Sequence, residues 1–370
     1  MLHLHHVNLQ PVTGGGEIYT HAVTRALRDA GAEVTLYVHR ANRLWDGLSG
    51  AVAVAGEEEL LDRLPAGAFV VTQSPLGQAA REWIAQRHRW IAFAHMPITG
   101  GRSAAPFRAS RLVVTVSNYC VELLRRAGIA QVHPEPLYGI ADVARAAAGP
   151  ILRRSPYTWD RRKFRDRLLG VFEPFLETFR IKAAFENLPG LTLGIVSLVS
   201  PIKQFPQLFT ILAPHLARHP QVRLEIFGSG GYAQVRDLRR ALAPLGDRAR
   251  FWGFQENVAA IYPQLDYLMT GLPEKEALGL NALEAQSCGT PVLAPNAPPF
   301  TETVIDGTGG FLYRDAREDG GADFAQLLDA IAAGRPRPDP RQAKEHLAKF
   351  SYPALVERAR RLLAHLEQIA

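Results

Sequence analysis

The sequence holds 370 residues, of which 47% are hydrophobic and 21% charged, a composition that fits a globular chain with two domains. No apolar run reaches the roughly 18 residues of a membrane span, and the first ten residues lack the features of a signal peptide, so we expect a cytoplasmic protein. The net charge of +6 indicates an anionic partner, and the two cysteines, far apart in sequence, fit a reducing compartment without a disulfide.

Strands and helices alternate from the start of the chain. Residues 2–8 predict a strand, residues 17–30 a helix that ends at Gly31, and residues 33–38 a second strand. Further short apolar runs predict strands at residues 51–55, 69–73, 90–95 and 111–116, with helical patterns between them. This alternation predicts a parallel sheet with helices on both faces for a first domain of residues 1–150.

The alternation restarts at Leu191, after a less regular stretch. Strands are predicted at residues 191–198, 222–227, 266–270 and 291–295, with a helix from about residue 205. We therefore expect an α/β protein with two Rossmann-like parallel sheets, the second in residues 191–350, facing a cleft at which the strands end. A last helix, in residues 351–370, could cap either domain.

The connecting segment, residues 151–190, is basic and then apolar. Residues 153–167 hold seven arginines and lysines against two aspartates, and leucines, valine and phenylalanines follow. Such a helix can lay its apolar face in a membrane interface while its cations meet anionic lipid. The alternative is a solvated connecting helix packed between the domains. Nucleic acid is not an expected partner, because no zinc-finger spacing, aromatic RNA-binding motif or basic recognition helix is present.

The most informative segment, residues 274–292, predicts a loop, a helix, a glycine stop and a strand. Eight helical residues rotate by about 80° beyond two full turns, so two glutamates at this spacing would diverge on one regular helix. We expect Glu276 on the loop and Glu284 within the helix, where it can accept protons from two ribose hydroxyls. The backbone N–H groups expected to be free for a phosphate or sugar oxygen at the helix N-terminus are those of Ala277, Leu278, Gly279 and Leu280.

This segment, including the match over its residues 279–292, resembles the E-x7-E signature of retaining glycosyltransferases of GT-B architecture, in glycosyltransferase family 4. The resemblance covers nearly the whole chain. It implies that Glu276 faces the hydroxyls of the donor sugar and Glu284 the ribose. It also implies a UDP-, GDP- or dTDP-sugar donor, a glycan or lipid-linked glycan acceptor, and transfer with retained anomeric configuration, either in the cytoplasm or at the inner face of the membrane.

Further positions match loops of that family. Gly15 and Gly16, after the first strand, resemble the glycines of a GGxE loop, where absent side chains let a diphosphate approach the backbone. Lys203 resembles the lysine that neutralises the leaving diphosphate. His95, at a strand end, resembles a histidine beside the donor sugar, although a core role is the usual one for such a histidine. Phe254 could border the base or belong to the core.

Two positions depart from the family pattern. The family normally carries an arginine five residues before the lysine, and Leu198 stands there; Gln73 occupies a strand end where relatives often carry histidine. Without that arginine, the site has one cation fewer to stabilise the charge that develops on the leaving diphosphate. The sequence is compatible with slow turnover, with a compensating cation elsewhere or with lost activity. The alternative functions are therefore a weak or inactive relative that binds nucleotide or a partner transferase, and a sugar-nucleotide epimerase.

Metal and dinucleotide chemistry are both disfavoured. No D-x-D sequence is present, which predicts transfer without a metal ion or other cofactor. The alternating His3, His5 and His6 are expected to pack in a buried strand. Residues 228–233 satisfy the G-x-G-x-x-A dinucleotide pattern, but the acidic residue expected at the end of the next strand is missing, so an NAD-dependent dehydrogenase is the least favoured function.

Overall fold

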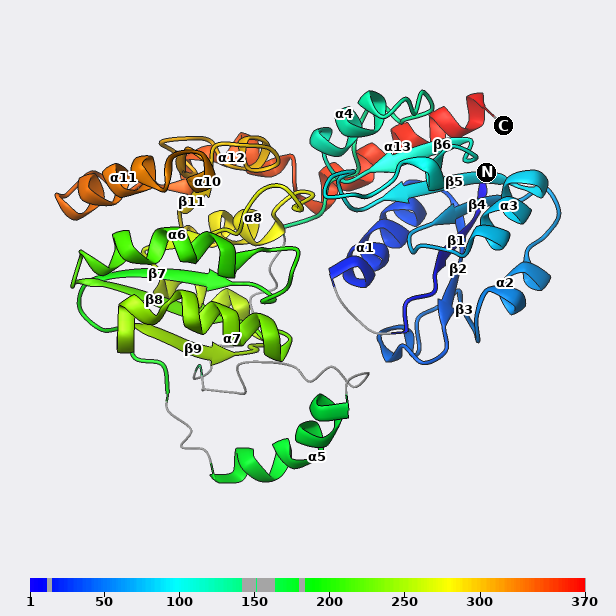
Figure 1. Cartoon of the computed structure of the whole chain (residues 1–370). Helices are drawn as coiled ribbons and strands as arrows, with labels where there is room; N and C mark the ends of the chain where they lie inside the picture. Colours follow the sequence, from blue (N-terminus) through cyan, green and yellow to red (C-terminus); the bar gives the residue numbers. More distant parts are fainter. Residues whose placement is uncertain (12–14, 142–150, 152–163, 180–183, 370) are drawn as a thin grey trace. The chain divides into compact units, whose positions relative to one another are not determined.

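A computed structural model describes residues 1–11, 15–141, 151, 164–179 and 184–369 (Figure 1). The chain forms two compact units, the first made of Met1–Ile140 with Ala348–Ala370 and the second of Ala141–Leu347. The division therefore falls ten residues before the expected end of the first domain at residue 150, and the described residues between 141 and the restart at Leu191 group with the second unit. Residues 12–14, directly before Gly15 and Gly16, and most of the basic stretch of residues 153–167 lie outside the described residues.

The first unit is built on a six-stranded parallel sheet in the order β3-β2-β1-β4-β5-β6. Its strands are β1 (His3–Asn8), β2 (Glu33–His39), β3 (Ala51–Val54), β4 (Phe69–Thr72), β5 (Arg89–Ala94) and β6 (Leu112–Thr115). Its helices are α1 (Gly15–Asp29), α2 (Glu57–Arg63), α3 (Gln78–Arg87), α4 (Asn118–Arg126) and α13 (Tyr352–Gln368). The direction of strand order reverses between β1 and β4, the point where doubly wound sheets bind ligands.

The C-terminal helix α13 belongs to the first unit, where it packs against α1 (Figure 1). Its buried side chains recur at helical spacing, including Leu355, Ala359, Leu362 and Leu366. The hydroxyl of Tyr352 donates to Asp29 at the end of α1 over 2.6 Å. The apolar stripe of α13 thus packs on the first unit, which answers which of the two domains the last helix caps.

The second unit repeats the same topology, with the strand order β12-β11-β10-β7-β8-β9. Its strands are β7 (Leu191–Val196), β8 (Val222–Phe227), β9 (Ala249–Gly253), β10 (Tyr267–Met269), β11 (Val292–Pro295) and β12 (Gly310–Tyr313). Its helices are α5 (Phe164–Phe179), α6 (Phe205–Ala217), α7 (Tyr232–Ala241), α8 (Leu280–Ser287), α9 (Phe300–Thr303), α10 (Ala316–Asp319), α11 (Ala322–Ala332) and α12 (Lys344–Ala348). Here the order reverses between β7 and β10. Among the described helices, none combines the length and apolarity needed to cross a bilayer.

The glycine-rich loop between β8 and α7 has a packing explanation. A Cβ at Gly228, whose φ is +139°, would overlap the carbonyl oxygen of Ser197, and a Cβ at Gly230 would overlap that of Val199. The Val199 N–H donates to Ser229 over 2.8 Å, so this loop lies backbone to backbone on the segment that follows β7. These glycines are therefore required by the approach of two loops, without a bound dinucleotide.

Candidate functional site

The candidate site of the second unit lies beyond the carboxyl ends of β7 and β10. Lys203 closes a turn after β7, in which its N–H donates to the Ser200 carbonyl over 3.1 Å. The Leu272 N–H, beyond β10, donates to the Lys203 carbonyl over 3.2 Å, and a Cβ at Gly271 would overlap that same oxygen. Gly271 therefore allows the two segments to meet, and this contact fixes the backbone that carries the lysine.

Lys203 pairs with Glu276, whose Oε2 accepts a hydrogen bond from the Lys203 Nζ. Both side chains are mostly buried, with 19% of the lysine and 12% of the glutamate side chain exposed. Burial would raise the pKa of Glu276, but the charge of Lys203 and the N–H groups of Gly279 and Ala277 outweigh it and hold the pKa below its usual range. Glu276 is therefore an anion at neutral pH, with Lys203 as its counter-charge.

Glu276 lies on the loop before α8, as the spacing predicts, but the expectation of four free N–H groups is wrong for two of them. The Gly279 N–H donates to Glu276 Oε1 over 3.1 Å, and the Ala277 N–H also serves this carboxylate. Gly279, with φ +80°, precedes the first residue of α8, Leu280, whose N–H has no intrahelical carbonyl to bind. The side chains of Ala277 and Leu278 are buried, so only their backbone can meet a ligand.

Glu284 lies in α8 and receives a hydrogen bond that the sequence did not reveal. The buried Tyr262 hydroxyl donates to Glu284 Oε2 over 2.7 Å. Burial raises the pKa of Glu284, while the Tyr262 hydroxyl and the charge of Lys203 act in the opposite direction. Tyr262 fixes one carboxylate oxygen, which leaves the other for an incoming hydroxyl. Tyr262 and Glu284 are 22 residues apart, so no local pattern relates them.

Leu198 and Phe254 are both solvent-exposed, by 56% and 52% respectively. Leu198 follows β7, and Phe254 follows β9. Exposure removes the core interpretation of Phe254, which is available for contact with a flat ring. Leu198 places an apolar side chain in solvent at the position where the family resemblance implies an arginine.

The first unit holds Gly15 and Gly16 at the start of α1. A Cβ at either glycine would meet no atom of the described residues within 4 Å, and neither glycine has a positive φ, so among these residues nothing requires glycine there. The strand end before them is fixed, because the Leu9 N–H donates to the Ser74 hydroxyl over 2.9 Å and Asn8 donates to Thr20 over 2.7 Å. These two hydrogen bonds fix the end of β1 against α1 and the segment after β4.

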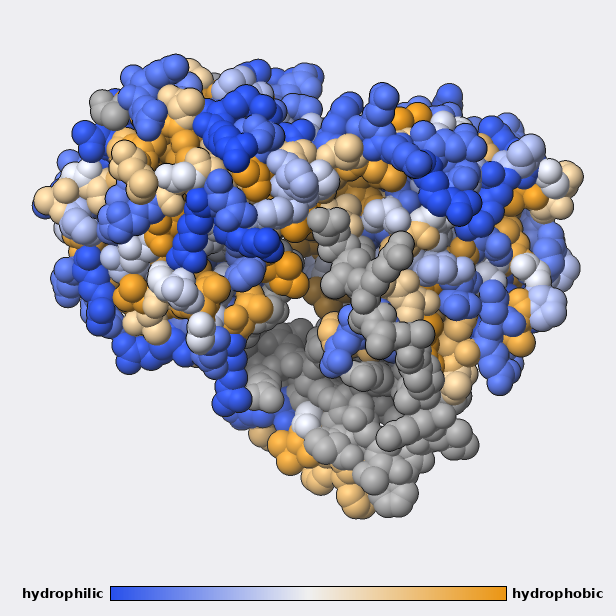
Figure 2. Space-filling model, turned by 180° about the vertical axis from the view of Figure 1, so that it is seen from behind, coloured by the Kyte–Doolittle hydropathy of each residue, from blue (hydrophilic) through white to orange (hydrophobic). Residues whose placement is uncertain are grey.

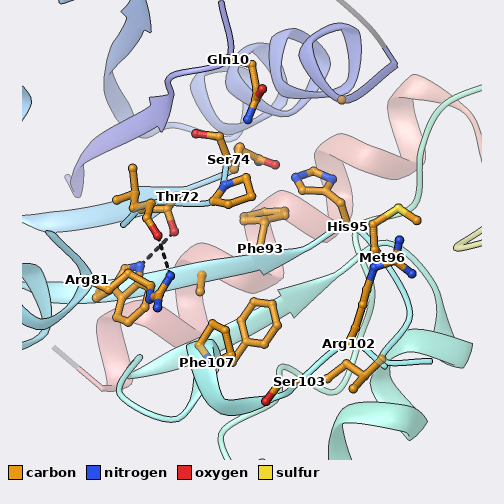
Figure 3. A pocket seen from close by; sticks show the side chains of 18 of the residues that line it. Gln10, Thr72, Ser74, Arg81, Phe93, His95, Met96, Arg102, Ser103 and Phe107 are labelled. Atoms are coloured by element: carbon orange, nitrogen blue, oxygen red, sulfur yellow. Dashed lines mark hydrogen bonds between the residues drawn. The ribbon is translucent and has the colours of Figure 1, made fainter. Parts of the chain in front are cut away.

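A cavity of about 470 Å³ lies beyond the ends of β4 and β5 in this unit. Gly16 and His95 line it, whereas Gly15 does not. Figure 3 shows Gln10, Ser74 and the His95 ring at one end and Phe107 and Ser103 at the other, with Phe93 between them. Most of the wall is apolar, including Leu76, Trp90, Ala92, Phe93, Ile98 and Phe107.

His95 is uncharged at neutral pH. Burial lowers its pKa to about 4, although a hydrogen bond to the backbone of Gln73 acts in the opposite direction. Its ring packs edge-on against Tyr19, with 5.3 Å between centroids. The bond to Gln73 occupies one ring nitrogen and leaves the other able to meet a ligand in the cavity.

The three N-terminal histidines do not form a metal site. His5 and His6 are buried, but His3 is exposed, contrary to the expectation of a fully buried strand. The His6 Nδ1 lies 2.8 Å from the Thr24 hydroxyl. Within the described ranges, no three histidine, cysteine or carboxylate side chains gather in an arrangement that could hold a metal ion.

The family-model match to known proteins falls in the second unit. Residues 191–333 match the family model of glycosyl transferases group 1. The fold, with its two six-stranded parallel sheets, matches solved structures of the GT-B fold. A structure of Anabaena Alr3699/HepE in complex with UDP and glucose superposes with a TM-score of 0.69, at 16% identity, over 98% of this chain and 100% of that one. A sucrose-phosphate synthase from Thermosynechococcus elongatus superposes with a TM-score of 0.66, at 17% identity, over all of both chains.

Two curated relatives match part of the chain by sequence. A D-inositol 3-phosphate glycosyltransferase from Stackebrandtia nassauensis is 33% identical over 178 residues, which are 44% of this chain and 39% of the relative. The enzyme of that name from Mycolicibacterium smegmatis is 34% identical over 155 residues, 40% of this chain and 35% of the relative. The matched segments thus span well under half of these relatives.

Proposed function

We propose that this protein is a retaining, metal-independent glycosyltransferase that moves a sugar from a nucleoside diphosphate to a hydroxyl acceptor. The observation that carries the proposal is the mostly buried ion pair of Lys203 with Glu276, just before α8. Glu284 lies near enough for the charge of Lys203 to act on its pKa. One cation and two carboxylates at a helix N-terminus match a ligand with a diphosphate and several hydroxyls. The group 1 domain found over residues 191–333 supports the same assignment.

The proposed reaction breaks the bond between the anomeric carbon and the diphosphate oxygen and forms a bond to the acceptor oxygen on the same face. The departing phosphate oxygen takes the acceptor proton. Lys203 and the N-terminus of α8 stabilise the charge that develops on the diphosphate. When the diphosphate competes for Lys203, Glu276 loses its counter-charge and can accept hydrogen bonds from sugar hydroxyls, while Glu284 accepts them from the ribose.

The test begins with binding, because the base and the sugar are unknown. We expect UDP, GDP or dTDP, or one of their glucose conjugates, to raise the melting temperature selectively. A ligand at about 100 times its Kd stabilises the native state by about 2.7 kcal/mol. Product analysis by NMR, with and without EDTA, then tests retention and metal independence. If no nucleotide shifts the melting temperature and no donor is hydrolysed or transferred, the proposal is wrong; a new sugar epimer formed without acceptor would identify an epimerase.

A weak or inactive relative is the second candidate, and the exposed Leu198 is the observation that favours it. A site that binds the donor but lacks one cation loses stabilisation in the transition state more than in the ground state. This candidate predicts a normal nucleotide-induced thermal shift with very slow donor hydrolysis. The two measurements above separate it from an efficient transferase.

We further propose that α5 contacts an anionic membrane surface. Its exposed apolar side chains are Phe164, Leu168, Val171, Phe172 and Phe175, whose spacing places them on one helical face. Figure 2 shows hydrophobic residues gathered over this helix. Arg165 and Arg167 are exposed on the same helix, and five further cations lie in residues 153–163. An apolar stripe beside clustered cations is the chemistry of an interfacial helix.

The double substitution Val171→Asp with Phe172→Asp is expected to reduce binding to phosphatidylglycerol vesicles at least tenfold. Burying one such apolar side chain contributes about 1.5–3 kcal/mol, and the added carboxylates repel anionic lipid. Co-sedimentation measures the effect, with neutral phosphatidylcholine vesicles and the variant Leu44→Asp, an exposed position of the first unit, as controls. Equal sedimentation of the wild type with both lipids would show that charge has no part in the contact.

A further inference from the structure

Gln73 carries an unsatisfied polar group in the wall of the first-unit cavity. It directly follows β4, it is one of the residues that line the cavity, and only 5% of the residue is exposed. Both polar atoms of its amide are buried, and within the part of the chain that the structure describes neither the Oε1 nor the Nε2 has a hydrogen-bond partner. Buried amides are almost always paired, because an unpaired one loses its hydrogen bonds to water without replacement. A change of the Gln73 rotamer would turn the amide toward the cavity, where a ligand can supply the missing partner.

Neighbouring polar side chains of the cavity already have partners in the protein. The Thr72 hydroxyl accepts from the Trp90 indole N–H over 2.9 Å, and the Ser74 hydroxyl accepts from the Leu9 N–H. An Arg81 guanidinium N–H donates to the Leu76 carbonyl over 2.5 Å. The Gln73 amide thus differs from them in having both of its polar atoms unused.

Much of the rest of the wall is apolar, although Gln10, Glu17, Arg102 and Ser103 also line the cavity. Phe93, Phe107 and Ile98 face the cavity, and its volume of about 470 Å³ suits a molecule of drug-like size. A polyol or sugar phosphate pressed against these side chains would leave several hydroxyls without hydrogen bonds, at a cost for each. A ligand with an aromatic or branched hydrocarbon body and one hydroxyl group would leave none.

We infer that the first unit binds an alcohol with an apolar body, whose hydroxyl hydrogen-bonds to the side-chain amide of Gln73. This inference rests on the proposed function, because it names the acceptor of that reaction: a hydrophobic aglycone in place of a polyol phosphate. His95 also lines the cavity, and its ring hydrogen-bonds to the backbone of Gln73.

The test pairs a ligand that has the hydroxyl with one that lacks it. Isothermal titration of the full chain with 2-naphthol and with 2-methylnaphthalene compares the two in the absence of any nucleotide. We expect the wild type to bind 2-naphthol about tenfold more tightly, the effect of pairing one buried polar group. Geraniol tests a branched hydrocarbon body, and D-inositol 3-phosphate tests the polyol alternative.

The variant Gln73→Met keeps the length of the side chain and removes the amide. It is expected to reduce the preference for 2-naphthol to about unity and to raise the melting temperature by about 2–4 °C, because an unpaired polar group is lost from the interior. A purely structural role for the amide would lower the melting temperature. Gln73→His restores a polar partner and should recover most of the preference, while Gln78→Met, at an exposed position of α3, should change nothing.

Three results would overturn the inference: equal affinity of the wild type for both naphthalenes, no binding of either, or tighter binding of D-inositol 3-phosphate than of 2-naphthol. Failure of the proposed function looks different. In that case no nucleotide shifts the melting temperature and no donor is consumed, whatever the cavity binds. If a donor is consumed and sugar is transferred to inositol phosphate but not to 2-naphthol or geraniol, the enzyme assignment stands and the aglycone assignment falls.

Discussion

Lys203→Ala is expected to reduce sugar transfer by about 100- to 1000-fold, the range found when one preorganised charge or donor is removed from a developing anion. Lys203 is the cation that pairs with Glu276 at the start of α8, and its backbone is held by the segment after β10. Its loss leaves the leaving diphosphate with the helix N-terminus alone. Because the charge on the diphosphate grows as the bond breaks, the rate should fall more than the affinity for nucleoside diphosphate.

The variant also leaves Glu276 without its counter-charge in a mostly buried position, so part of any loss could reflect a less stable protein. The double variant Lys203→Ala with Glu276→Gln removes that uncompensated charge. It should recover the melting temperature and stay inactive. Lys344→Ala, an exposed lysine of the second unit, is the matched control for loss of a positive charge. Turnover in Lys203→Ala within threefold of the wild type would contradict the assigned role.

Leu198→Arg is expected to increase kcat for donor hydrolysis and transfer at least tenfold. Leu198 is exposed at the end of β7, so an arginine can be placed there without displacing the core. The resemblance to family 4 implies a cation at this position, and a second charge near the diphosphate should contribute about as much as one preorganised donor. The gain should shrink as ionic strength rises, because exposed charges are screened.

Initial rates with the donor that the wild type accepts measure this effect, at low and at high salt. Leu198→Met is the control, since it lengthens the side chain without adding charge. If Leu198→Arg is no faster than Leu198→Met, another cation already supplies the missing charge, and the departure from the family pattern has no catalytic cost. A high kcat of the wild type would be consistent with the absence of a gain in Leu198→Arg.

The alternation of strands and helices, and the site of the second unit, could be predicted from local sequence. Short apolar runs predicted most strands correctly, because parallel strands buried on both faces need near-continuous hydrophobic side chains. Glu276 was expected on a loop and Glu284 on a helix from their spacing alone, and α8 begins between them. Lys203 was found through a loop resemblance, and the structure brings it to Glu276 across 73 residues of sequence.

Other features depend on contacts between distant segments, which no local pattern encodes. The N–H groups of Ala277 and Gly279 were expected to be free, but the Glu276 side chain folds back onto them. Tyr262 was missed, because its hydrogen bond to Glu284 joins the segment before β10 to α8, 22 residues further along the chain. The unit boundary at residue 140 was also missed, since a division of domains follows from packing and not from a break in periodicity.

The sequence by itself thus determined the α/β alternation and the two-domain architecture, and it supplied the residues of the second-unit site as a prediction, because strand burial, helix starts and motif spacing are local properties of the chain. Only the tertiary structure decided the charge state of Glu276 and His95, the attachment of α13 to the first unit, and the unpaired amide of Gln73. Those depend on how far each polar group is removed from water and on which atoms surround it. The burial and the hydrogen-bond partners of a polar group are set when the chain packs, and they cannot be derived from local sequence patterns.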